Sequence, residues 1–312
     1  MRRRCVIAAS CLSAVVALAP RAGAEPRAVP EAGAREPYVE TLPGTTVSFD
    51  MAPVPGGAFE MGSAEGEPGR RPDEGPVHRV EVGGFWMGRR EVTWAEYDLF
   101  RADPEAIVRA AWEPPPGADA LTRPTPAYAD ETFGFGKEGQ PVISITHAAA
   151  VEYTRWLSRK AGRPYRLPTE AEWEWACRSA GGEGPLGDRA WFAANAESRP
   201  HPVATRAPDR LGLFDLLGNV AEWVLDRYEK DAYASRSSAA VTKNPIVAPD
   251  DREYPHVARG GSWKDAGSGL RCAARLSSSR AWNERDPQDP QSIWWLTDGT
   301  FVAFRVVSPF EP

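Results

Sequence analysis

Short apolar segments alternate with glycine- and proline-rich connectors along most of the chain. In HRVEVGGFWMG, Val80 and Val82 alternate with charged residues, the period-two pattern of a half-buried strand. Similar short apolar segments follow along the chain, separated by turn residues. The pattern therefore predicts several short strands rather than one long, regular sheet.

Three helices are predicted from their start signals and from apolar residues spaced along one face. Thr93 and Glu96 form a capping box in TWAEYDLF, and Thr169 and Glu172 repeat that device in PTEAEWEWACR. The third helix is predicted over 147–161. The expected inner-face and stop residues are Tyr97, Phe100, Tyr153, Trp156, Leu157, Gly162 and Gly181.

The composition fits one large, loop-rich α+β domain. A chain of 312 residues, 42% of them apolar, can bury a sizeable core. With 28 Gly, 30 Pro and 12 Trp, its core is expected to depend on large aromatic side chains that hold loops in place. The net charge of -6, without a cluster of Lys and Arg among aromatic residues, argues against a nucleic-acid partner.

The first 24 residues have the pattern of a signal peptide. Three arginines precede an apolar run from Cys5 to Ala19, and the small residues AGA at 22–24 follow. We expect cleavage after Ala24 and export to the periplasm or out of the cell. Lipoprotein processing at Cys11 and a twin-arginine signal are alternatives that fit the sequence less well.

Residues 25–44 are rich in Ala, Pro, Glu and Arg, which predicts a disordered or extended arm before a domain over 45–312. No later segment reaches the roughly 20 apolar residues of a membrane-spanning helix. Once the signal peptide is removed, only Cys177 and Cys272 remain. In an oxidising compartment we expect them to pair with each other, and two separately buried thiols are the alternative.

Two groups of carboxylates are candidate sites. Glu170, Glu172 and Glu174 crowd one helix start, where the helix dipole and the capping box account for them and an acid/base pair is the alternative. In GLFDLLGNVAEW, two carboxylates and the carbonyls of a Gly-Asn turn offer the oxygen ligands that calcium takes. A polar turn in which Asp215 caps the backbone is the equally weighted alternative. The four residues of this second group are Asp215, Gly218, Val220 and Glu222.

The histidines give no local metal motif. They are scattered, without HxH, HxxxH or HExxH spacing, at His78, His147, His201 and His256. The chain also has no GxSxG, GxGxxG or Walker loop.

The motifs LPTEAEWEWACR, GLFDLLGNVAEW, RGGSW…RCAAR and FVAFRVV, preceded by PVPGGAFEMGS and EVTWAEY, resemble the sulfatase-modifying-factor family, which comprises formylglycine-generating enzyme and its relatives. They stand in family order over about residues 50–308. The resemblance implies a loop-rich α+β fold related to C-type lectins, with few short helices and short antiparallel strands.

The resemblance also implies positions for structural groups. It implies a disulfide between Cys177 and Cys272. It implies a calcium site at Asp215, Gly218, Val220 and Glu222. A second family calcium site corresponds to Asn195 and Ala196, although the acidic loop that completes it in the family is missing from this sequence.

The family's catalytic feature is absent. Formylglycine-generating enzyme activates oxygen on copper held by two cysteines, and those positions correspond here to Asp265 and Gly267. Copper(I) prefers thiolate ligands, which neither residue supplies. The resemblance therefore implies that the chain does not convert a sulfatase cysteine to formylglycine by the copper route.

Other branches of the family suggest other activities. Ergothioneine-type sulfoxide synthases bind iron on an added helical domain that has no counterpart here. A periplasmic branch that acts in maturing the siderophore pyoverdine is similar in its export and single-domain build. Further relatives are attached to kinases or surface systems as binding modules.

The segment SSSRAWNERDPQDPQSIWWLTDGTF precedes the last strands, where the family shapes its substrate groove. Its tryptophans predict either a ligand surface with aromatic anchors or a long loop pinned to the core, and both can hold. The groove candidates are Trp263, Asp265, Arg280, Trp282, Trp294 and Trp295.

These observations leave two main hypotheses. The first is an exported binding or assembly domain, with structural calcium only, that holds a peptide, protein or small molecule in the old groove. The second is an oxidoreductase of altered chemistry, in which Asp265 with His147 or His256 binds a redox metal. Formylglycine generation is a third, weaker alternative.

Overall fold

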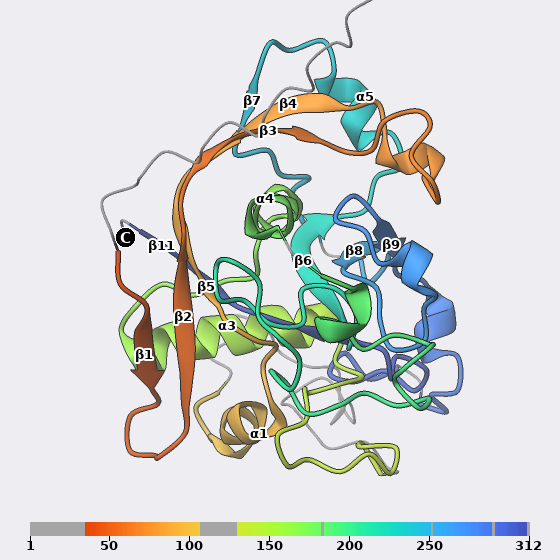
Figure 1. Ribbon diagram of the computed structural model, residues 1–312. Coiled ribbons are helices and arrows are strands. Elements are labelled where there is room, and N and C mark those ends of the chain that lie inside the picture. The colour runs from red at the N-terminus through yellow and green to blue at the C-terminus, as the bar shows by residue number, and fades with distance from the viewer. Residues whose placement is uncertain (1–34, 107–129, 182–183, 251, 289–290, 311–312) are drawn as a thin grey trace, which may run out of the picture.

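The computed structural model describes residues 35–106, 130–181, 184–250, 252–288 and 291–310. Within these ranges the helices are few and separated by long loops, as Figure 1 shows. The α-helices are α1 (Trp94–Ala102), α3 (His147–Ala161), α4 (Glu170–Ala180) and α5 (Ala232–Arg236). Short 3-10 turns occur at η1 (Pro72–Glu74), η2 (Leu186–Asp188), η3 (Gly267–Gly269) and η4 (Arg280–Asn283).

The described strands form three small sheets. The first has the order β1-β2-β5-β11, with β1 (Tyr38–Thr41), β2 (Ser48–Val54), β5 (Phe85–Gly88) and β11 (Val307–Pro309). The second has the order β10-β6-β8-β9, with β10 (Val302–Phe304), β6 (Ala221–Arg227), β8 (His256–Arg259) and β9 (Arg275–Ser277). The third has the order β3-β4-β7, with β3 (Gly57–Met61), β4 (His78–Val82) and β7 (Thr242–Lys243).

The expected α+β fold is confirmed, with one refinement to the strand directions. Most neighbouring strands are antiparallel, but β10 runs parallel to β6 and β7 runs parallel to β4. Val80 and Val82 alternate with more exposed residues in β4, as the period-two pattern predicts. The parallel pairs join segments that are far apart in the chain, and no local pattern signals such a pairing.

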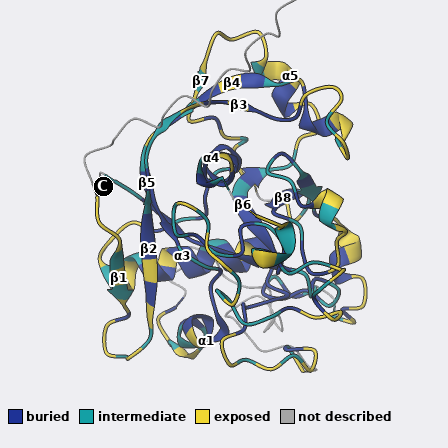
Figure 2. Ribbon diagram, in the orientation of Figure 1, coloured by how far each residue is buried: buried dark blue, intermediate teal, exposed yellow. Residues whose placement is uncertain are grey.

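The two long helices connect the sheets. Helix α4 packs against β3 and β4 on one side and against β6 and β8 on the other, and α3 packs against α1 and β6. Both helices are largely buried in Figure 2. The loops around them carry most of the exposed positions. The core therefore lies between small sheets and is held together by α3 and α4.

The predicted helix signals are confirmed. The Thr93 and Glu96 capping box starts α1, and the Thr169 and Glu172 box starts α4. Helix α3 ends at Gly162, whose φ of 65° is a left-handed conformation that glycine adopts without strain. Helix α5 was not predicted, because five residues are too few to show a periodic pattern.

The folded chain begins before the predicted boundary near Thr45. Strand β1 pairs with β2, so part of the predicted arm is an edge strand. Its residues alternate between half-buried and exposed positions, a weak signal in sequence. The predicted signal peptide lies outside the described residues. Among the helices of the described ranges, none has the length and apolar character needed to cross a membrane.

Candidate functional site

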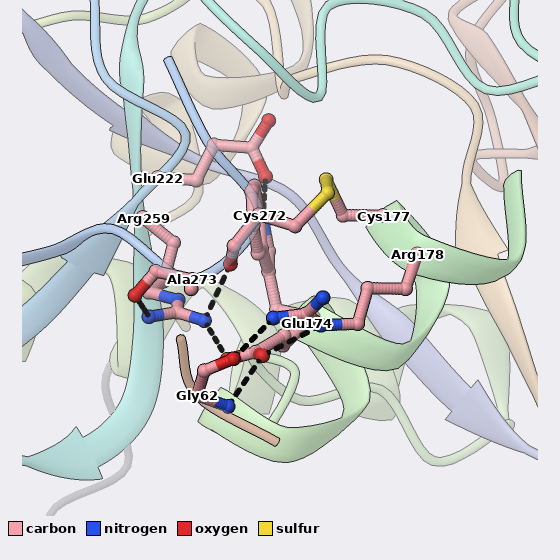
Figure 3. Close-up of a disulfide and its surroundings, with 9 residues drawn as sticks. Gly62, Glu174, Cys177, Arg178, Glu222, Arg259, Cys272 and Ala273 are labelled. Carbon is pink, nitrogen blue, oxygen red and sulfur yellow. Dashed lines mark hydrogen bonds and ion pairs between the residues drawn. A yellow bond between two sulfur atoms is a disulfide. The ribbon is translucent and has the colours of Figure 1, made fainter. Parts of the chain in front are cut away.

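The expected disulfide joins Cys177 in α4 to Cys272 in the loop before β9. Their Cα atoms are 5.6 Å apart, and 95 positions separate them in sequence. Figure 3 shows the bond beside the end of α4. The other two cysteines of the sequence, Cys5 and Cys11, lie outside the described residues. Every cysteine of the described ranges is therefore oxidised, and none offers a free thiolate.

A set of buried ion pairs lies next to this disulfide; we call Glu170, Glu174, Arg259 and Arg275 the balanced cluster. Arg259 donates from Nη2 to Glu174 Oε2 at 2.5 Å and to the Cys272 carbonyl at 2.7 Å. Arg275 donates from Nε to Glu170 Oε1 at 2.7 Å. Burial alone raises the pKa of Glu170, but the charges of Arg275 and Arg259 outweigh it and hold that pKa below its usual value. Arg178, which is partly exposed, also donates to Glu174 at 2.8 Å, so every carboxylate oxygen of the balanced cluster has a partner.

The balanced cluster decides between the two interpretations of the glutamates in α4. Glu172 accepts the Thr169 N–H at 2.8 Å and binds Arg166, as a capping residue should. Glu174 also accepts the Gly62 N–H at 2.8 Å. The structural explanation is therefore confirmed over an acid/base pair. The arginine partners come from distant segments and were not predicted.

A second set of buried charges surrounds the Gly-Asn turn; we call Glu91, Asp215, Glu222 and Arg305 the acid-rich cluster. Arg305 donates from Nε to Glu222 Oε2 at 2.7 Å, and Trp173 Nε1 donates to the same oxygen at 2.8 Å. Glu91 accepts from Asn219 Nδ2 at 3.1 Å, and its Oε2 is buried without a partner. Three carboxylates thus share one guanidinium group.

Asp215 is the most unusual member of the acid-rich cluster. Its Oδ2 accepts the Ala204 N–H at 2.7 Å, so it caps a backbone as the structural alternative proposed. Its Oδ1 has no N–H donor, and its one side-chain hydrogen-bond neighbour is Glu91, whose pKa burial and the charge of Asp215 raise well above its usual value. Burial raises the pKa of Asp215 to about 6, even though the Ala204 hydrogen bond and the charge of Arg305 oppose the change. It also lines a pocket of about 420 Å³ that the disulfide borders.

The predicted calcium ligands fit this arrangement only in part. Asp215 Oδ1 is a buried oxygen without an N–H donor, of the kind a cation accepts. The Glu222 carboxylate is occupied by Arg305 and Trp173. Across the described ranges, no three His, Cys, Asp or Glu side chains are grouped so that they could hold a metal ion. Calcium at Asp215, with the Gly218 and Val220 carbonyls, therefore stays a prediction.

The second predicted calcium position is engaged in protein contacts. Asn195 Oδ1 accepts the Phe192 N–H at 2.8 Å, and the Ala196 carbonyl lies 3.0 Å from His201 Nε2. Both oxygens thus take part in a local turn, and calcium at this position stays a prediction.

Asp265, which the family resemblance places at a copper position, closes a turn. Its Oδ2 accepts from the Ser262 N–H at 2.8 Å and from the Ser262 hydroxyl at 2.7 Å. It lines a pocket of about 170 Å³ together with Arg71 and Arg271. Gly267 lies in η3 and brings no side chain. This corner of the fold therefore offers one carboxylate and no soft ligand.

The tryptophans of the predicted groove are buried. Trp294 is 1% exposed, and Trp294 and Trp295 border only a small cavity of about 20 Å³. Trp263 donates from Nε1 to the Thr300 carbonyl, and Trp282 packs against Phe301. These four side chains anchor the loop to the core, which favours the pinned-loop alternative. Arg280 is exposed at the start of η4.

The structure brings together two histidines that sequence spacing keeps apart. His147 begins α3 and His256 begins β8, and their rings stack with centroids 3.8 Å apart. Both border a pocket of about 450 Å³, whereas Asp265 lines a different pocket. The hypothesis that Asp265 and these histidines hold one metal ion is therefore not supported. The stacked pair itself was missed, because its members come from distant elements.

Together these features define a class: a loop-rich α+β domain whose α4 is bonded through a disulfide to the segment before β9. Residues 39–286 match the family model of the sulfatase-modifying factor enzyme 1-like domain, and the chain belongs to this family.

The relatives include full enzymes and part of a kinase. The chain is 30% identical over 263 residues to the serine/threonine-protein kinase Pkn1 of Chlamydia trachomatis serovar L2, covering 78% of this chain and only 39% of the kinase. It is 27% identical over 321 residues to the formylglycine-generating enzyme of Mycobacterium tuberculosis, covering 83% of this chain and 97% of that enzyme. The solved structure of PvdO from Pseudomonas aeruginosa superposes with a TM-score of 0.64 at 25% identity, covering 89% of this chain and all of that chain.

Proposed function

We propose that this protein is an exported binding or assembly domain that keeps the formylglycine-generating fold without its copper-thiolate chemistry. One observation carries the proposal: both cysteines of the described ranges are joined to each other, and the two copper positions hold Asp265 and Gly267. A disulfide that spans two elements of the core suits an oxidising compartment such as the periplasm.

Calcium has a supporting role in this proposal. Asp215 Oδ1, which has no N–H donor, would be its carboxylate ligand, and the Gly218 and Val220 carbonyls would complete the contact from the chain. Bound there, calcium would supply positive charge to the acid-rich cluster. We assign calcium a structural role, because Asp215 lines a different pocket from Asp265, the residue at the proposed copper position.

A copper titration tests the missing chemistry. The purified protein, with its disulfide intact, competes for copper(I) against a chromophoric chelator, and the formylglycine-generating enzyme of Mycobacterium tuberculosis serves as the positive reference. We expect no stoichiometric uptake, since carboxylate oxygen is a poor ligand for copper(I). Uptake of one copper(I) per chain with both cysteines still oxidised would overturn the proposal.

An oxidoreductase of altered metal chemistry is the second candidate. The similarity to the formylglycine-generating enzyme of Mycobacterium tuberculosis, of which 97% is covered, favours an enzyme of this family. Elemental analysis of protein purified from the periplasm separates the two candidates. The binding domain should carry calcium as its only stoichiometric metal, whereas the oxidoreductase should carry iron, copper or another redox metal.

A further inference from the structure

The stacked histidines form one wall of the 450 Å³ pocket. The two rings are almost parallel, with an interplanar angle of 6°, and the ring of Trp223 meets His147 edge to face at 5.7 Å. His147 is 6% exposed and His256 is 5% exposed. Three aromatic rings from α3, β6 and β8 thus meet at this pocket, although their positions in the sequence give no hint of it.

The hydrogen bonds of the two imidazoles determine which nitrogen carries the proton. His147 Nε2 lies 2.9 Å from the Val224 carbonyl, and His256 Nε2 lies 3.1 Å from the Arg252 carbonyl. A carbonyl only accepts, so each Nε2 is the donor. Burial, and then the neighbouring His256, lower the pKa of His147 to about 3, and burial lowers that of His256 to about 4. Both rings are therefore neutral near pH 7.

A neutral ring that donates from Nε2 keeps a lone pair on Nδ1. The Nδ1 atom of His256 is buried and has no hydrogen-bond partner. A buried acceptor without a donor is unfavourable compared with one that is hydrogen-bonded. His256 lines the pocket, but its Nδ1 is closed off from it in the unliganded fold, so a ligand with an O–H or N–H group would satisfy this acceptor after a small shift of the ring.

The remaining surface of the pocket combines apolar residues with paired charges. Its apolar lining includes Val151, Leu225, Ile293 and Leu296. At the rim, Arg155 pairs with Glu152 at 2.7 Å, and Arg252 pairs with Asp250 at 2.6 Å. Glu253 also lines the pocket but is exposed, so the three acids leave no buried counter-charge for a cation. Its volume lies within the range of small-molecule sites.

We propose that this pocket binds a neutral aromatic ligand with a hydroxyl group, a phenol, whose O–H donates to His256 Nδ1 while its ring lies against the apolar lining. An ammonium group would lose its hydration without gaining a buried counter-charge, whereas a phenol loses little. The same chemistry is offered by a free phenol and by a tyrosine side chain of a peptide.

This inference rests on the proposed binding function, because it names the ligand class of a binding domain. It does not depend on the copper positions, since Asp265 lines a separate pocket. A protein that took up copper(I) could still bind phenols, and a protein without copper could fail to bind them. The two tests can therefore fail independently.

The test is a titration of the whole, disulfide-intact protein with p-cresol, followed by long-range proton-nitrogen NMR of the imidazoles. The chain has 4 His, so the spectrum is simple. We expect p-cresol to move the Nδ1 resonance of His256, and toluene, which lacks the hydroxyl, to bind about tenfold more weakly. Equal binding of toluene, or no movement at His256 up to the solubility limit of p-cresol, overturns the proposal.

Two further probes identify the source of the phenol. N-acetyl-tyrosinamide is compared with p-cresol, and N-acetyl-phenylalaninamide is its control without the hydroxyl. Tighter binding of the tyrosine derivative than of p-cresol assigns the site to a peptide ligand. Tighter binding of p-cresol assigns it to a free phenol.

A matched pair of variants tests the role of the ring nitrogen. His256→Phe keeps an aromatic ring in the stack and removes Nδ1. His201→Phe is its control, because His201 also stacks on an aromatic ring, Trp191, and places Nε2 3.0 Å from a carbonyl, yet does not line this pocket. We expect His256→Phe to weaken p-cresol binding about tenfold and His201→Phe to leave it unchanged. If His256→Phe does not fold, the wild-type comparison of p-cresol with toluene still decides.

Discussion

The balanced cluster and the acid-rich cluster are both buried, but only in the first does each carboxylate have a guanidinium group of its own. In the balanced cluster two glutamates face two arginines, and a hydrogen bond from Arg259 to the Cys272 carbonyl connects it to the disulfide. In the acid-rich cluster three carboxylates share Arg305, and two carboxylate oxygens lack an N–H donor. All carboxylate oxygens of the balanced cluster have partners, although Arg259 Nε has none, which indicates a structural role for its two glutamates. An incomplete set indicates a place for a proton or a cation.

The largest expected effect comes from removing the single cation of the acid-rich cluster. Arg305→Met leaves Glu222 beside Asp215 and Glu91 without a positive charge, and we expect the free energy of unfolding at pH 7 to fall by about 5 kcal/mol. Arg275→Met is the matched control, because Arg259 still faces the glutamates; we expect a loss of about 3 kcal/mol. Urea unfolding in the presence of a chelator measures both. Equal losses would show that the charge imbalance has no energetic consequence.

Removal of the disulfide should be the next largest effect. The bond closes a loop of 95 residues, so the Cys177→Ser, Cys272→Ser double variant should lose about 4 kcal/mol through the greater entropy of its unfolded chain. Since Arg259 binds the Cys272 carbonyl, combining this variant with Arg259→Met should cost less than the sum of the separate losses. Strict additivity in urea unfolding would separate the disulfide from the balanced cluster.

The pH dependence of stability should reveal the acid-rich cluster. The pKa of Asp215 is raised from 3.8 to about 6, so the folded state binds more protons than the unfolded state between these values. This group therefore stabilises the fold at low pH, and the contribution is lost as the pH rises from about 4 to 6. The histidines act in the opposite direction, because their pKa values are lowered.

Asp215→Asn isolates this contribution. Relative to the wild type in a chelator, the variant should gain about 2 to 3 kcal/mol on going from pH 4 to pH 7. Asp231→Asn, at an exposed position, is the control and should show no such gain. Urea unfolding at the two pH values gives the comparison. A flat difference between Asp215→Asn and the wild type would mean that Asp215 is ionised in the folded state throughout.

The smallest expected effect is stabilisation by calcium. At a calcium concentration ten times its dissociation constant, the wild type should gain about 1.4 kcal/mol, because the ion binds only the folded state. Asp215→Asn should lose this gain, whereas Asp231→Asn should keep it. Thermal unfolding with calcium and with chelator measures the difference. An unchanged response in Asp215→Asn would place any calcium away from the acid-rich cluster.

Local signals in the sequence predicted local structure well. The capping residues Thr93 and Thr169 and the stop at Gly162 mark the helix ends that the structure shows. The pairing of Cys177 with Cys272 was one of two alternatives on the residues alone, and the family resemblance pointed to the bond that is found. A short motif was enough to predict each helix end, and a count of two cysteines was enough to suggest the disulfide.

Partners that meet only through the fold were not predicted. Arg305 and Glu222 are joined by the parallel pairing of β10 and β6, and the stack of His147 on His256 depends on the packing of α3 against β6 beside β8. The groove tryptophans show a second limit of sequence analysis. Their sequence fits either an exposed ligand-binding surface or a loop held to the core by buried side chains. Only the structure, in which Trp294 is buried in the core, distinguishes the two.

We propose that this chain keeps the family fold while lacking the chemistry that converts cysteine. A peptide containing the CxPxR sequence, incubated with the protein, oxygen, copper and a thiol reductant at a concentration that leaves the Cys177–Cys272 bond intact, tests it directly by mass spectrometry. The formylglycine-generating enzyme of Mycobacterium tuberculosis is the positive control. We predict that the peptide keeps its cysteine with this protein and is converted to the aldehyde by the control enzyme. Catalytic conversion by this protein, at more than one peptide per chain, would contradict the account.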